Sequence, residues 1–157
     1  MDAQLTPTEI NQYQQILQGD NSTQKALAIL EKHNGKFDDS LDELYTEKFG
    51  TLPMMPEGKS LWQVTLQQLR QEVCGDEGFR SQIKEYSKNP GSTPLLTGLI
   101  VYLVGLVGTG GIPIDPAIAT VVVLYILKIG LNIFCEYTES SPALPPDEPD
   151  SRQLPPD

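Results

Sequence analysis

The sequence predicts an all-α protein in which a short three-helix bundle and two amphipathic helices precede an apolar transmembrane hairpin and a disordered tail. Three observations lead to this prediction. Residues 1–93 are polar with apolar side chains at helical spacing, residues 94–135 are almost uncharged, and residues 138–157 are acidic and rich in proline. Helical spacing indicates amphipathic helices, and long uncharged runs are typical of membrane spans.

Composition narrows the classes of function. The chain has 157 residues and a formal net charge of −10. Nucleic acid is not an expected partner, because no basic stripe is available to neutralise phosphates. The two cysteines, Cys74 and Cys135, lie in the polar half and at the end of the apolar run. We therefore expect no disulfide framework and a reducing compartment.

The first 50 residues predict three short helices. Thr6 and Glu9 have the spacing of a capping box, and an apolar stripe follows them. A second helix precedes the Asn34-Gly35 stop, and a third begins in "FDDSLDEL" with Asp38 or Asp39 as its N-cap. Together these helices can bury a small shared core, which predicts a domain over residues 1–50.

The stretch "ALAILEKHNGKFDDSLDEL" resembles the second and third helices of ubiquitin-associated-like three-helix domains, and the resemblance covers about residues 8–48. It implies a three-helix fold with a general protein-binding role; the alternative is a generic three-helix bundle. In that family a Met-Gly-Phe loop carries much of the ligand contact, whereas this chain has "LQGD" there. The family positions are taken by Ala26, Leu27, Leu30, Gly35, Ser40, Leu41 and Leu44. The candidate partner-binding residues are Leu17, Gln18, Gly19, Leu44 and Tyr45.

Residues 51–59 form a predicted linker, and residues 60–93 form a predicted amphipathic helical region. Ser60 and Gln63 make a second capping box before a broad apolar face. A shorter helix follows and ends at the Asn-Pro-Gly stop. These two helices either form a second small unit or pack on the first.

No constellation of catalytic, cofactor-binding or metal-binding residues is recognisable. Pro53 stands where a phosphate-binding loop ending in "EGKS" needs its first glycine. His33 is the only histidine, and Cys74 has no nearby histidine to activate it. We therefore expect a protein that is not an enzyme and needs no cofactor or metal.

The apolar half predicts two helices that cross a membrane. Residues 94–111 and 116–135 would reach roughly 27 and 30 Å, near the hydrocarbon thickness. Lys128 is the only charged residue in the second segment. A lysine at a helix centre costs about 2.5 to 3.5 kcal/mol, which the apolar residues outweigh. The two segments would insert together as a hairpin over residues 94–135.

Lys128 and Asn132 lie one helical turn apart and allow two interpretations. The lysine can extend towards the membrane interface with Asn132 as a partner. Alternatively, both residues face the interior of a homo-oligomer or a water-filled path. Gly98, Gly105 and Gly108 would allow close approach of helices.

The flanking charges predict the topology. Arg80, Lys84 and Lys88 precede the first segment, so the positive-inside rule places both termini, including the tail over residues 136–157, in the cytoplasm. The expected function is that of a small integral protein of the inner or plasma membrane. It would contact membrane lipid and bind an unidentified protein partner. Its layout looks like that of adaptors and membrane-acting effectors in bacterial regulatory or conflict systems. The alternative is a soluble all-helical interaction protein with residues 94–135 as a buried hairpin.

Overall fold

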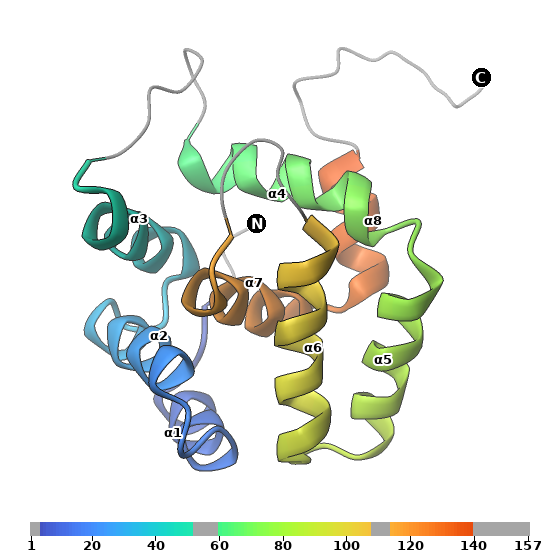
Figure 1. Ribbon diagram of the computed structural model, residues 1–157, viewed down its shortest axis with the longest axis horizontal. Coiled ribbons are helices and arrows are strands. Elements are labelled where there is room, and N and C mark those ends of the chain that lie inside the picture. The colour runs from blue at the N-terminus through green and yellow to red at the C-terminus, as the bar shows by residue number, and fades with distance from the viewer. Residues whose placement is uncertain (1–3, 52–59, 108–113, 140–157) are drawn as a thin grey trace.

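The computed structural model describes residues 4–51, 60–107 and 114–139. These residues form an all-α fold, as predicted, with eight helices (Figure 1). The helices are α1 (Pro7–Ile16), α2 (Asn21–Lys32), α3 (Phe37–Phe49), α4 (Leu61–Val73), α5 (Glu77–Lys88), α6 (Thr93–Val107), α7 (Pro116–Ile129) and α8 (Leu131–Glu139).

Two helices begin at the capping boxes that the sequence predicts. The Thr6 hydroxyl accepts from the Glu9 backbone N–H at 3.1 Å, and the Glu9 carboxylate accepts from the Thr6 N–H at 2.9 Å. Ser60 and Gln63 exchange the same pair of hydrogen bonds at the start of α4. Each box satisfies backbone donors that the first helical turn leaves without partners.

The start of α3 differs from the prediction. The helix begins at Phe37, and Lys36 occupies the N-cap position without a side-chain cap. Asp38 and Asp39, one of which was the predicted cap, lie in the first turn instead. Negative charge there is stabilised by the helix dipole, which explains these residues without a capping role.

Helix α7 lies near the centre of the molecule, with α1–α3 on one side, α5, α6 and α8 on the other, and α4 across the top of the view (Figure 1). Every residue from 117 to 126 is buried. Helices α2, α3, α6 and α8 pack against it. Because these neighbours surround it, a helix that is apolar on all sides needs no lipid to cover it.

The apolar half therefore does not form the predicted transmembrane hairpin. Helix α6 has 15 residues and α7 has 14, so each is about 21 to 23 Å long, against roughly 30 Å of hydrocarbon. Gly130, with a φ of 94°, ends α7 and divides the predicted second segment between α7 and α8. No helix within residues 4–51, 60–107 and 114–139 is long and apolar enough to cross a membrane.

The prediction of an integral membrane protein with cytoplasmic termini is consequently wrong, and the burial of α7 favours the alternative of a buried apolar element. Two other predictions fall largely on residues that are not described. The predicted disordered tail begins within α8, and its residues 140–157 lie outside the described residues. Residues 52–59 of the predicted linker also lie outside them.

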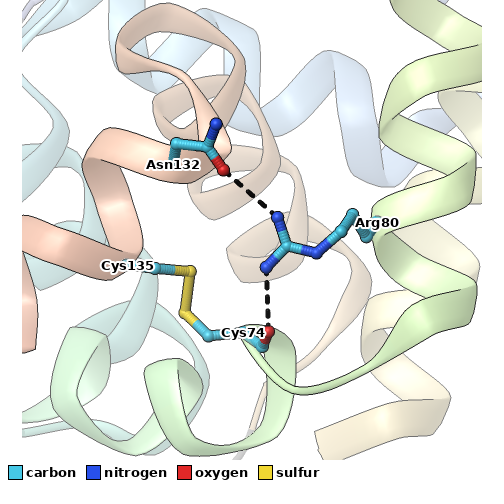
Figure 2. Close-up of a disulfide and its surroundings, with 4 residues drawn as sticks. All are labelled: Cys74, Arg80, Asn132 and Cys135. Atoms are coloured by element: carbon cyan, nitrogen blue, oxygen red, sulfur yellow. Dashed lines mark hydrogen bonds between the residues drawn. A yellow bond between two sulfur atoms is a disulfide. The ribbon is translucent and has the colours of Figure 1, made fainter.

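A disulfide joins Cys74, which follows α4, to Cys135 in α8 (Figure 2). The two Cα atoms are 5.8 Å apart, within the usual range for a disulfide. The expectation of unpaired cysteines is therefore wrong. The two positions are separated by 61 residues in the sequence, and only the packing of α8 on α4 brings them together.

Candidate functional site

Lys128, which the sequence places in an apolar run, has an acidic partner. Its Nζ atom lies 2.9 and 3.1 Å from the two carboxylate oxygens of Glu9. Partial burial acts to raise the pKa of Glu9, but the hydrogen bond from the Thr6 N–H and the Lys128 ammonium outweigh it and hold that pKa below its ordinary value. The ion pair ties the last turn of α7 to the first turn of α1.

Asn132 does not pair with Lys128 as predicted; Figure 2 shows its side chain facing Arg80. The Arg80 Nη1 donates to Asn132 Oδ1 at 3.2 Å, and Nη2 donates to the Cys74 carbonyl at 2.9 Å. The break at Gly130 starts a new helix, so Asn132 no longer continues the face of Lys128. Arg80 and the disulfide together tie α8 to α4 and α5.

The glycines predicted to allow close helix approach are not packed against another helix backbone. A Cβ atom added at Gly98 would meet only the Gln82 side chain, at 3.7 Å, and one added at Gly105 would meet nothing within 4 Å. Gly108 lies outside the described residues. Gly98 and Gly105 therefore form no helix-packing seam within the described part of this chain.

The candidate partner-binding residues are divided between the core and the surface. Leu17, Leu44 and Tyr45 are 1%, 4% and 9% exposed, so their side chains belong to the core. Gln18 and Gly19 are exposed in the turn between α1 and α2. A partner approaching the folded chain there could contact this turn, but it could not reach the three buried side chains.

A groove that the sequence does not reveal lies between α1 and the turn joining α5 to α6. It encloses about 540 Å³. The mostly buried Tyr86 forms its floor, and half-buried Tyr13 and Ile16 form one wall. Its lining residues are Gln12, Tyr13, Gln15, Ile16, Tyr86, Pro90, Gly91 and Thr93.

Hydrogen bonds hold the two walls of this groove in place. The Thr93 hydroxyl donates to the Ile16 carbonyl at 2.6 Å, which joins the start of α6 to the end of α1. The Gly91 N–H donates to the Tyr86 hydroxyl at 3.3 Å. Gly91 has a φ of 92°, a conformation that favours glycine and lets the chain reverse into α6. The groove is therefore formed by the fold itself.

The chemistry of the groove suits binding better than catalysis. None of its lining residues is charged. Burial, with smaller contributions from Tyr86 and Glu9, raises the pKa of Tyr13 to about 12, so its hydroxyl stays protonated near neutral pH. Gln12 and Gln15 are exposed, and each amide offers donors and an acceptor. The surface combines the half-buried ring of Tyr13 with neutral hydrogen-bonding groups.

A second groove of about 450 Å³ lies where the N-terminal segment crosses α1 and α2. Gln14 Nε2 donates to Glu31 Oε1 at 3.4 Å and joins two of its walls. The lining of this second groove includes a carboxylate, and its walls are already bridged. The groove beside Tyr86 is therefore the better candidate site.

The described residues contain no group of three or more His, Cys, Asp or Glu side chains that could hold a metal ion. Comparison of the chain with models of protein families, with characterised proteins and with solved structures finds no match. The assignment of a function consequently rests on the geometry of the groove.

Proposed function

We propose that the chain is a non-enzymatic peptide-binding module whose groove takes an extended, proline-containing segment. The observation that carries this proposal is the lining itself: Tyr13, Tyr86 and Pro90 around an uncharged groove. Proline-rich ligands dock in aromatic-lined grooves, because their polyproline II conformation is already formed and costs little entropy to bind.

The polar part of the lining supports the same kind of ligand. A polyproline II segment makes no internal hydrogen bonds, so its carbonyl groups need partners when they leave water. Gln12 and Gln15 lie on the same helix as Tyr13 and expose their amides at the edge of the groove. They provide donors for the ligand carbonyls beside the aromatic surface.

The resemblance to ubiquitin-associated-like domains also implies a protein partner, but at a different surface. The exposed residues of that surface, Gln18 and Gly19, follow directly after α1. A partner of that kind would contact the turn between α1 and α2 instead of the groove. Gln18 is therefore a useful comparison, since it is a glutamine that lies near the groove but outside its lining.

An NMR titration of the full chain with an octaproline peptide tests the proposal. We expect saturable shifts of the Gln12 and Gln15 side-chain amides and the Gly91 N–H. The Gln12→Ala/Gln15→Ala variant should bind more weakly than the parent, because each lost hydrogen bond is worth about 0.5 to 1.5 kcal/mol. Gln18→Ala should bind like the parent. Absence of saturable shifts, or weakening only by Gln18→Ala, would contradict the proposal.

A further inference from the structure

We infer that the groove is occupied in cis by residues 154–157 of the same chain, which compete there with any external peptide. This inference rests on the proposed function. The sequence contains Leu-Pro-Pro-Asp twice, at residues 144–147 and 154–157. Both copies follow α8 in the chain and lie outside the described residues.

The repeated segment has the chemistry that the groove requires. A proline restricts the residue before it to extended or polyproline II conformations, so Leu-Pro-Pro has little freedom to lose on binding. A proline ring matches the half-buried ring of Tyr13, and a leucine matches the apolar side chain of half-buried Ile16. The aspartate would remain in water at the end of the groove, whose lining carries no charge to repel it.

The two copies differ in how far they can extend from the end of α8 towards the groove. The groove includes Thr93 at the start of α6, whereas α8 ends near the opposite end of that helix (Figure 1). Helix α6 has 15 residues and is about 22 Å long. At the rise of polyproline II, the four residues 140–143 before the first copy could reach about 12 Å, and the fourteen residues 140–153 before the second could reach about 43 Å. Only the second copy can reach the groove.

The origin of the tether is fixed, which favours binding within one chain. The disulfide between Cys74 and Cys135 attaches α8 to the end of α4, and Arg80 contacts both elements. A short tether from a fixed point gives an effective concentration of order millimolar. A segment whose own affinity is only in the range of about 100 μM would therefore occupy the groove most of the time.

The experiment measures how tightly octaproline binds to three forms of the full chain. In the distal variant, Pro155→Ala/Pro156→Ala, the second copy loses both prolines. In the matched control, Pro145→Ala/Pro146→Ala, the first copy loses the same residues. We expect the distal variant to bind octaproline about tenfold more tightly than the parent, because the internal competitor is weakened. The control should bind like the parent, and the parent's Gly91 shift should not depend on protein concentration.

The other outcomes separate the inference from the function on which it rests. If all three forms bind octaproline equally, the groove binds peptides but residues 154–157 do not occupy it, and only the inference fails. If no form binds octaproline, the proposed function fails as well. Tighter binding by the control alone would overturn the argument from reach. A Gly91 shift that grows with protein concentration would place the segment of a second copy in the groove and overturn binding in cis.

Discussion

Replacing Cys74 and Cys135 with serine should lower the free energy of unfolding by about 4 kcal/mol. The disulfide connects positions 61 residues apart. For a loop of that length, the loss of chain entropy in the unfolded state is about 14 cal/mol/K, or about 4 kcal/mol at 25 °C. The effect arises mainly in the unfolded state, because the disulfide restricts the chain there.

The folded state should survive this change, since α8 has other attachments. Phe134 is fully buried and Leu131 is 7% exposed, and Asn132 keeps its hydrogen bond to Arg80. The helix content of the double serine variant should therefore equal that of the parent before denaturation. The denaturant midpoint should fall.

Urea unfolding followed by circular dichroism measures the difference. The parent should lose the same stability when a reducing agent is added, whereas the double serine variant should not respond to it. A loss smaller than about 1 kcal/mol with an unchanged dependence on urea would refute the entropic argument. Two titratable thiols in the denatured, unreduced parent would show that the loop is not closed at all.

Three further predictions concern single positions. Gly130→Ala should cost about 1 to 3 kcal/mol in urea unfolding, because φ is 94° there, whereas Gly75→Ala, in open space, should cost far less. Because the pKa of Glu9 is depressed, its ion pair with Lys128 stabilises the fold at pH values above the ordinary carboxylate pKa of 4.5. This stability is lost as the pH falls through the lower pKa that Glu9 has in the folded state. Lys128→Leu should therefore cost less than about 1 kcal/mol at neutral pH and should flatten the acid limb of a plot of stability against pH. Thr65 is fully buried, and its hydroxyl has no hydrogen-bond partner among the described residues, so Thr65→Val should leave the melting temperature unchanged or raise it; a clear fall would contradict this reasoning.

Local signals predict the helices well in this chain. The capping boxes at Thr6 and Ser60 depend on side chains three residues away, so the sequence contains all the information that they need. The apolar half could not be interpreted in the same way. A hydropathy pattern shows that residues 116–135 avoid water, but it does not show whether lipid or other helices cover them.

Long-range partners explain why the candidate site could not be predicted from the sequence. Glu9 is 119 positions from Lys128, and the groove depends on the hydrogen bond between Ile16 and Thr93, 77 positions apart. Leu17 and Leu44 were candidate partner contacts because of the resemblance to ubiquitin-associated-like domains: Leu17 lies in "LQGD", where that family has its ligand-contacting loop, and Leu44 takes a family position. Here the core contains them.

The central position of α7 also determines when the chain can complete its core during synthesis. Helices α2 and α3 pack against α7, yet the ribosome makes α7 only after most of the other helices have emerged. Until then, the inner faces of α2, α3 and α6 have no covering partner, and such surfaces attract chaperones or other nascent chains. Folding of this protein should consequently be completed late, and a chain that stops before Pro116 should aggregate.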